Sequence, residues 1–285
     1  MDSNEFWMRY TVGERDFHGV DLSDVNLSGA NLAGVCWKRA RLDRADLREI
    51  QALGSDWNGI SVSQANLTGA CLSGAKLTGA DLSGAILDHA DLSGANLWRA
   101  NLKQASLVNA NLGRSNLHAA HLQAANLSEA YLNGANCTDA NLTEAILTGS
   151  SLCRAVLVNA KLGFATLQGA NLEQADLSNA NLTDANLNRA NLIGATLDRA
   201  TLQRVNLNGV NLTGANLSHA NLMDAQLVLA CLRGARLDWA ELTEANLTEA
   251  DLSWASVDNT NLSGANLYNA TLKMVNLDVA IRAGS

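Results

Sequence analysis

The sequence predicts an all-β fold: a four-sided β-helix over residues 15–279 behind a short N-terminal helix. Two observations predict it. A large apolar residue recurs at every fifth position from Phe17 to Leu277, which makes 53 consecutive units without an insertion. Aromatic residues and glycines then recur at twenty residues, which is four units and therefore one coil of four sides. At four units per coil, the 53 units form about 13 coils.

The five-residue unit reads Ala-(Asn/Asp)-Leu-x-x, and the large position is Leu in 46 of the 53 units. A continuous α-helix would turn by about 500° over five residues and spread this column of Leu around its surface. A straight strand, with its period of two, would place every second Leu on the wrong side. We therefore expect each unit to contain one short extended segment and one turn, with Ala and Leu directed inward.

The twenty-residue period is visible in two columns of the sequence. Phe17, Trp37 and Trp57 replace Leu at intervals of twenty, which predicts a core aromatic ladder in three successive coils. At the last position of the unit, one series of positions twenty apart holds Gly in 8 of 13 coils, against 10 of 40 in the other series. Since Gly tolerates positive φ, we expect one of the four corners to favour this conformation.

Residues 35–62 depart most from the pattern. Ile50 and Ile60 stand where Ala is usual, and Ala52 stands where Leu is usual. Ser55 also precedes Trp57. Compensating exchanges of large and small residues predict either a repacked coil or a bulged coil.

The first fourteen residues predict a capping helix near residues 3 to 12. Asp2 and Glu5 can form a capping box, Phe6 and Tyr10 share one helical face, and Gly13 can end the helix. Such a cap is needed because an open end of a β-solenoid exposes unpaired strand edges and apolar interior.

The tail, residues 280–285, contains no amphipathic segment long enough to cover the last coil. Either the tail folds over that coil or another chain does. We therefore expect a homodimer through the C-terminal end as one way to close it.

The repeated unit, Ala-(Asn/Asp)-Leu-x-x, resembles that of the pentapeptide-repeat family over residues 15 to 279. The stretch from Arg9 to Phe17 resembles the entry segment of cyanobacterial members. The resemblance implies a right-handed quadrilateral β-helix with a narrow interior filled by Leu or Phe and a small residue. It also implies a regulatory or scaffolding role through protein contacts, and some members of the family resemble DNA and bind DNA gyrase in its place.

Composition predicts one soluble, cytoplasmic domain. No linker interrupts the repeat, no apolar run approaches membrane-spanning length, and the start lacks the basic and apolar regions of a signal peptide. Proline is absent, as suits a backbone whose N–H groups join ladders. The five cysteines contain no Cys-x-x-Cys, which argues against a disulfide framework or a zinc site.

Three surfaces are candidates for partner contacts, because the interior is filled. The first is a cluster of basic residues interleaved with acidic ones, which is either a patch for an acidic partner or a mixed-charge solvated face: Lys38, Arg39, Arg41, Arg44 and Arg48. The second is an acidic ladder at equivalent positions one or two coils apart: Asp198, Asp238, Asp258 and Asp278. The third is an apolar patch: Met223, Val228, Leu229, Trp239, Trp254 and Met274.

The sequence predicts neither an enzyme nor a cofactor or metal protein. His118 and His121 straddle one corner without a third ligand, and no catalytic triad, phosphate-binding loop or dinucleotide motif is present. A filled solenoid also offers no concave pocket for catalysis.

These observations favour a non-catalytic scaffold or regulator that presents a rigid solenoid surface to a protein partner of unknown identity. The alternative is a DNA mimic that binds gyrase, although residues 96 to 190 carry six basic and six acidic residues and so have no net charge. A purely structural spacer is the second alternative. We expect no membrane association and no direct binding of nucleic acid.

Overall fold

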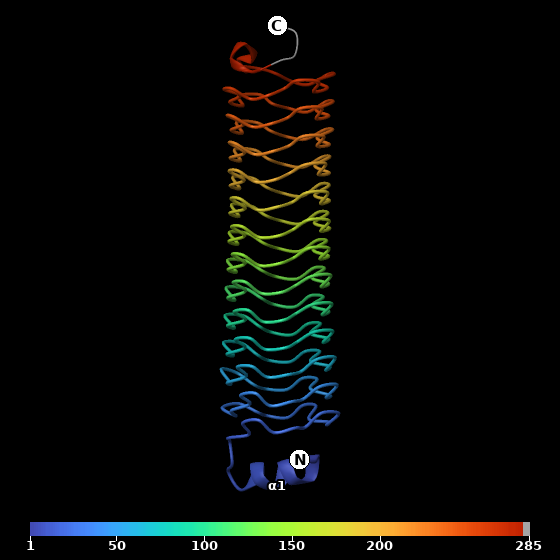
Figure 1. Ribbon diagram of the computed structural model, residues 1–285, viewed down its shortest axis with the longest axis vertical. Helices are drawn as coiled ribbons and strands as arrows, with labels where there is room; N and C mark the ends of the chain where they lie inside the picture. Colours follow the sequence, from blue (N-terminus) through green and yellow to red (C-terminus); the bar gives the residue numbers. More distant parts are fainter. Residues whose placement is uncertain (282–285) are drawn as a thin grey trace. The chain divides into compact units, whose positions relative to one another are not determined.

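The computed structural model describes residues 1–281, and the chain divides into two compact units, Met1–Asn141 and Leu142–Ser285. Within each unit the backbone winds into stacked coils (Figure 1). Parallel bridges join residues twenty apart, from Asp16 with Cys36 onward in the first unit and from Ile146 with Thr166 onward in the second. The predicted twenty-residue coil is therefore confirmed.

Within residues 1–281, regular secondary structure is limited to two short helices, α1 (Ser3–Thr11) and the 3₁₀ helix η1 (Leu277–Val279). The described residues contain no strand, because only one residue of each five-residue unit forms a bridge before the chain turns. The extended segments predicted from the sequence are thus shorter than a β-strand. No helix among residues 1–281 is long and apolar enough to cross a bilayer.

Four of the five backbone N–H groups in a unit have backbone acceptors, as residues 66–70 illustrate. Leu67 and Gly69 donate to carbonyl oxygens of the next coil at 2.6 and 2.9 Å, and Asn66 donates to the preceding coil at 2.9 Å. Ala70 closes the turn with a hydrogen bond to the Leu67 carbonyl at 3.0 Å. Since unpaired backbone groups are costly, the fifth N–H needs a partner as well.

A side chain accepts from the fifth N–H in many units. The Asn66 Oδ1 atom accepts from the Thr68 backbone N–H at 3.0 Å, which gives a physical reason for Asn or Asp at this position. In five of the units that lack Asn or Asp there, an Asp or Asn twenty residues before the donor takes its place. These acceptor–donor pairs are Asp43–Ser63, Asn58–Thr78, Asp88–Val108, Asn208–Val228 and Asp238–Asp258.

Each corner from Gly19 to Met274 contains one residue with a left-handed backbone, so the expectation that one of the four corners would favour positive φ was wrong. The last residue of each unit has positive φ from Gly19 to Met274, whereas the residue before it does not. This combination, with a hydrogen bond across the turn, is typical of a type II turn. Of these corner residues, 34 are not glycine, so the hydrogen bonds of the stack hold many L-residues in a conformation that is unfavourable for them.

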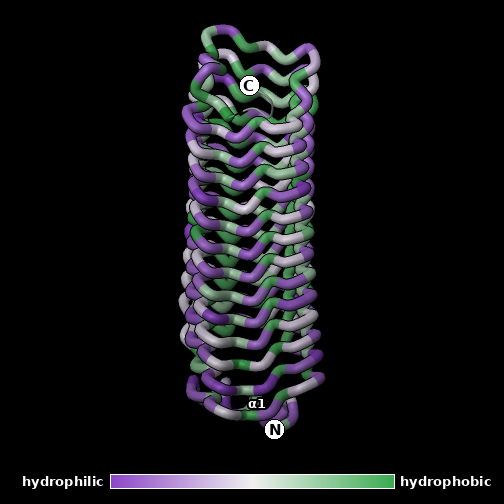
Figure 2. The backbone as a smooth tube through the Cα atoms, turned by 45° about the horizontal axis from the view of Figure 1, so that its top comes forward, coloured by the Kyte–Doolittle hydropathy of each residue, from purple (hydrophilic) through white to green (hydrophobic). Residues whose placement is uncertain are grey.

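The interior of each of the two compact units consists of the Leu and Ala columns, and hydrophobic and hydrophilic segments alternate along each coil (Figure 2). The rings of Phe17 and Trp37 stack at a centroid distance of 5.4 Å, and both residues are fully buried. Trp57 is also fully buried and follows Trp37 in the next coil, where the Trp37 N–H donates to the Asp56 carbonyl at 2.8 Å.

The irregular stretch is a repacked coil and not a bulged one. Ile50, Ala52 and Ile60 are all buried, and parallel bridges of unchanged spacing pass through the region. The small Ala52 lies one unit before the large Trp57, so the two exchanges compensate in volume.

The capping helix is confirmed by α1. Asp2 is the N-cap, and its side chain accepts from the Glu5 N–H at 2.8 Å. Phe6 is fully buried, with its ring centroid 4.8 Å from that of Phe17 and 5.5 Å from that of Trp37. Gly13 follows the helix with φ of 98°. Thus α1 covers the aromatic end of the first unit.

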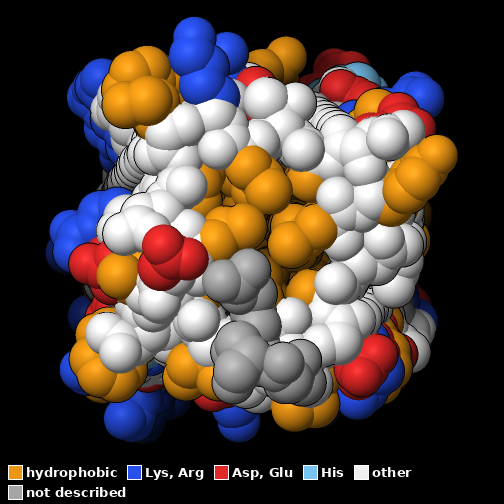
Figure 3. Space-filling model, turned by 90° about the horizontal axis from the view of Figure 1, so that it is seen from above, with side chains coloured by type: hydrophobic (Ala, Val, Ile, Leu, Met, Phe, Trp, Pro, Cys, Tyr) orange, Lys and Arg blue, Asp and Glu red, His pale blue; other side chains and the backbone are white. Residues whose placement is uncertain are grey.

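The C-terminal end of the second unit is more open. Inward residues of its last coil are only half-buried, whereas the same columns one coil earlier are fully buried, and apolar side chains are visible from this end (Figure 3). Ala280 ends η1, and Ile281 forms a bridge with Asn261. Residues 282–285 of the predicted tail lie outside the described residues.

Two buried serines in the small inward column give a matched test of hydrogen-bond satisfaction. The Ser115 Oγ atom is buried and has no hydrogen-bond partner among residues 1–281, whereas the Ser150 Oγ donates to the Leu147 carbonyl at 2.7 Å. We expect Ser115→Ala to raise the free energy of unfolding by about 1 kcal/mol, because it removes an unsatisfied hydroxyl. Ser150→Ala should leave it unchanged or lower it. Denaturant unfolding of both variants measures the difference, and stabilisation by Ser150→Ala alone would contradict this account.

Candidate interaction surfaces

The basic cluster forms a network of ion pairs in the first coils. Arg44 binds Asp24 through two hydrogen bonds at 2.7 and 2.8 Å, and the pair joins two coils, since its members are twenty residues apart. Arg48 binds Asp46 in the same two-point manner at 2.6 and 2.7 Å. Each arginine lowers the pKa of its aspartate partner through these hydrogen bonds.

The remaining cations of the cluster differ in their pairing. Lys38 lies 3.1 Å from Asp56, and Arg41 lies 3.2 Å from Asp43. Arg39, at a left-handed corner, is in no ion pair within the described residues. Four of the five cations are therefore neutralised locally, as in a mixed-charge solvated face, and exposed pairs of this kind contribute little to stability.

Asp43 is the most buried carboxylate of this region, with 7% of its surface exposed. It accepts from the Ser63 backbone N–H at 3.2 Å and from the hydroxyls of Ser61 and Ser63. Burial alone would raise the pKa of Asp43, but the hydrogen bonds from the two serines and Arg41 outweigh it, so the pKa is lowered. Asp43 is thus a structural carboxylate that holds two coils together.

Asp198, Asp238 and Asp258 of the acidic ladder occupy one column, as their spacing predicts, but the four members have different surroundings. Asp238 accepts from the Asp258 backbone N–H at 3.2 Å and lies 3.6 Å from Arg236, and Asp198 lies 3.9 Å from Arg199. Asp278 is in η1, where its N–H donates to Asn276 Oδ1 at 3.1 Å. Two of the four carboxylates therefore have an arginine within 4 Å, and Asp238 also caps a backbone N–H.

The apolar candidates do not share one column. Trp254 and Met274 stack at one corner in successive coils, as the hydrogen bond from the Trp254 N–H to the Lys273 carbonyl at 2.9 Å shows. Leu229 and Trp239 are at two other corners, because their numbers do not differ from these by multiples of twenty. Trp239 instead stacks on His219 at 6.4 Å. Met223 and Val228 precede two of the corner residues, so the predicted single patch is dispersed.

Large exposed apolar residues at left-handed corners are confined to the second unit. Their exposed fractions run from 55 to 68%, and their φ values from 59 to 66°: Phe164, Leu229, Trp239, Trp254 and Met274. In the first unit, the left-handed corner residues are polar residues, Gly or Ala. Phe164 was not singled out from the sequence, although its place at the last position of a unit would have marked it.

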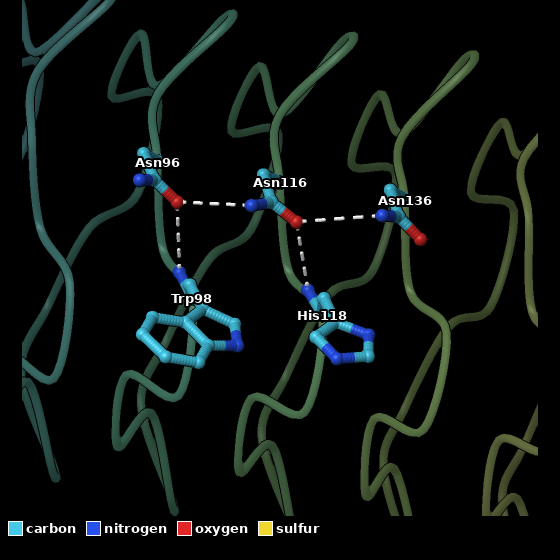
Figure 4. Close-up of a pocket in the computed structure, with 5 residues that line it drawn as sticks. All are labelled: Asn96, Trp98, Asn116, His118 and Asn136. Atoms are coloured by element: carbon cyan, nitrogen blue, oxygen red, sulfur yellow. Dashed lines mark hydrogen bonds between the residues drawn. The ribbon is translucent and has the colours of Figure 1, made fainter.

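A shallow hollow on the first unit is lined by Asn96, Trp98, Asn116, His118 and Asn136 (Figure 4). Sequence reasoning missed this group. The signal was available, because the three asparagines are spaced by twenty, as are Trp98 and His118.

No group of three or more His, Cys, Asp or Glu residues within the described part of the chain could hold a metal ion. His118 instead lies 3.9 Å from Asp139.

Burial in the Leu column raises the pKa of the Cys137 thiol to about 12, so this cysteine is held in its unreactive, protonated form.

A family model described as pentapeptide repeats matches nearly the whole chain in successive copies. The matched residues are 16–49, 54–84, 85–123, 120–159, 135–174, 165–204, 175–214, 200–238 and 245–280. The chain belongs to the pentapeptide-repeat family. Pentapeptide-repeat proteins form right-handed quadrilateral β-helices and are generally non-catalytic.

Among solved structures, this pentapeptide-repeat protein is similar to HetL of the cyanobacterium Nostoc sp. strain PCC 7120, a protein involved in the regulation of heterocyst differentiation. The two are 30% identical over 100% of this chain and 99% of HetL, with a TM-score of 0.26. The Nostoc PCC 7120 protein alr5209 is 34% identical over 32% of this chain and 76% of its own, with a TM-score of 0.29. Rfr23 of Cyanothece 51142 is 31% identical over 38% of this chain and 63% of its own, with a TM-score of 0.20. No protein with a curated description matches the chain.

The lowered pKa of Asp43 predicts that the stability of the first compact unit, Met1–Asn141, falls in acid. A carboxylate whose folded-state pKa lies below its unfolded value stabilises the fold above the unfolded pKa, about 3.9 for Asp, and this stabilisation is lost as pH falls through the folded pKa. Asp43→Asn should keep the cap, since Asn58 caps Thr78 in the same way with a neutral amide. Denaturant unfolding at neutral pH and near pH 3 should show a smaller acid-induced loss for Asp43→Asn than for the natural chain. Equal losses would refute the role assigned to this carboxylate.

Proposed function

We propose that this pentapeptide-repeat protein is a non-catalytic regulator or scaffold that binds a protein partner through the corners of its second unit. The observation that carries the proposal is the presence of five large, exposed apolar side chains at left-handed corners between residues 142 and 281. The similarity to HetL over the full chain supports a regulatory role.

Two separate costs fall on each of these residues. A left-handed backbone costs an L-residue roughly 1–2 kcal/mol. An exposed indole or thioether also leaves apolar surface in water. The first unit shows that the fold does not require such residues, because its corners consist of Gly, Ala and polar side chains. Residues that impair stability without a structural need are typical of binding surfaces.

Trp254 and Met274 are the best candidates for the centre of the contact. They lie in successive coils of one column and are 55% and 68% exposed. Trp and Met are both enriched in protein interfaces, and Trp is also frequent among the residues that dominate binding energy. The neighbouring Lys273 adds a charged residue at the edge of this corner.

The alternative of a DNA mimic finds less support. A duplex surrogate needs continuous negative charge, whereas arginines lie beside Asp198 and Asp238 in the acidic ladder. The basic cluster of the first coils is also locally neutralised. A partner that recognises apolar corners fits the second unit better than a partner that recognises DNA.

A double substitution tests the proposal without destabilising the fold. Trp254→Asn with Met274→Asn removes both apolar side chains, and Asn tolerates the left-handed conformation well. We expect this variant to be at least as stable as the natural chain and to lose its partner. Quantitative affinity capture from the native lysate, followed by thermal unfolding of each purified bait, measures both effects.

The control is Arg189→Asn with Glu249→Asn, which changes two corner residues and leaves the net charge unchanged. A protein captured in stoichiometric amount by the natural chain and the control, but not by the Trp254–Met274 variant, supports the proposal. Capture that is unaffected by the Trp254–Met274 variant overturns it. Inhibition of gyrase supercoiling would favour the DNA mimic, and the absence of any partner would favour the spacer.

We further propose that two copies associate through the open end of the second unit. Inward residues of the last coil are half-buried, and the N–H groups of Leu267, Asn269 and Leu272 have no backbone acceptor within the described residues. Sedimentation velocity over a range of concentrations should show a dimer. A charged residue in the exposed interior, as in Leu272→Glu, should restore the monomer. A strict monomer of the natural chain at high concentration would end this proposal.

A further inference from the structure

The hollow on the first unit is built from one side of three successive coils. Asn96, Asn116 and Asn136 are joined in sequence by parallel bridges, and Trp98 and His118 follow the first two asparagines by two residues. The hollow has a volume of about 560 Å³ and is open to solvent. Both rings project on the same side of the row of amides (Figure 4).

In the row of amides, the oxygens of Asn96 and Asn116 each accept two hydrogen bonds, whereas each amide nitrogen donates only one. Asn96 Oδ1 accepts from Asn116 Nδ2 at 3.0 Å and from the Trp98 N–H at 3.2 Å. Asn116 Oδ1 accepts from Asn136 Nδ2 at 3.4 Å and from the His118 N–H at 3.2 Å. Each amide nitrogen carries two hydrogens, and only one of them has an acceptor among the described residues. Each of the three amides therefore keeps one N–H donor for a ligand, repeated at the coil spacing of about 4.8 Å.

The border of the hollow adds an aromatic ring and positive charge. Trp98 is 36% exposed, and the Arg99 guanidinium lies over its ring at 4.6 Å from the centroid. Lys76 is paired by a bridge with Asn96, so it stands in the same column as the asparagines, and it is in no ion pair within residues 1–281. Two carboxylates lie nearby. Asp139 is 3.9 Å from His118 Nδ1, and Asp56, which a bridge pairs with Lys76, binds Lys38 at 3.1 Å.

We propose that this hollow binds a linear acidic oligosaccharide, with one sugar ring against Trp98 and the chain along the row of amides. A surface rich in donors fits a ligand rich in acceptors, and the ring, hydroxyl and carboxylate oxygens of a uronic acid chain provide them. The C–H face of a pyranose packs on an indole ring. An extended peptide fits less well, because its backbone N–H groups would need acceptors that the asparagines have already used.

Isothermal titration with hexagalacturonate, with neutral cellohexaose in parallel, tests the site directly. We expect hexagalacturonate to bind and cellohexaose to bind more weakly, because only the acidic chain has carboxylates for Lys76. Trp98→Ala should weaken binding of hexagalacturonate by about tenfold, the usual scale for an aromatic contact plus its buried area. Lys76→Gln should reduce the preference for the acidic chain.

Asn116→Asp is the variant that separates the site from the fold. It keeps an oxygen for the His118 N–H but replaces the amide nitrogen, which donates to Asn96 Oδ1, by a second oxygen and a negative charge. Asp is already used at this position of the unit in Asp81 and Asp91. Asn191→Asp in the second unit is the matched control. It belongs to the same kind of amide pair, with Asn171 at 3.0 Å.

Weaker binding for Asn116→Asp and unchanged binding for Asn191→Asp supports the proposal. Failure of hexagalacturonate to bind, or binding that survives both Trp98→Ala and Asn116→Asp, overturns it. The test is independent of the protein-binding proposal, because it concerns the first unit and a purified ligand.

Discussion

The structure depends on the hydrogen bonding of the backbone N–H groups within a unit of only five residues. Four of them find carbonyl acceptors in the same coil or in a neighbouring one, and in many units the oxygen of an Asn or Asp side chain accepts from the fifth. Because a single residue of each unit forms a bridge before the next turn, the coils are held together without strands. The same arrangement directs Leu and Ala inward and leaves outward columns of side chains at regular spacing.

The left-handed residue at each corner presents its side chain outward, and in the second unit such side chains form the proposed binding surface. Glycine would be the least strained choice at each corner, yet most corners carry other residues. Stability alone therefore does not select these side chains, and the fold accepts a wide range of them. The first unit uses this freedom for charged and polar residues, and the second unit uses part of it for Phe, Leu, Trp and Met.

Much of the fold could be predicted from the sequence, because the repeat is a direct record of which residues face inward. The coil length followed from Phe17, Trp37 and Trp57, and the N-terminal cap followed from Asp2 and Phe6. The expectation that one of the four corners would favour positive φ was wrong, because Gly marks where the left-handed conformation is easiest and not every place where it occurs. Hydrogen bonding across the coils imposes it elsewhere.

The candidate sites were less predictable than the fold. Residues of the apolar group were close in sequence but fall on different corners, since position within the twenty-residue coil decides which side chains are neighbours. For the charge cluster, the sequence did not show that Asp24 and Asp46 bind two of its arginines. The hollow beside Trp98 was missed because each of its residues is ordinary in its own unit.

The constant length of the five-residue unit also limits which insertions and deletions such a chain can accept during evolution. Loss of one residue would place Leu outside and polar residues inside in everything that follows. Loss of five would keep the interior filled, but every later outward column would move to the next side of the coil, and neighbours such as Trp98 and His118 would be separated if the loss fell between them. Only whole coils can be gained or lost without rearranging the surface, so duplication in steps of twenty is the route by which this molecule can grow and keep its outward columns of side chains.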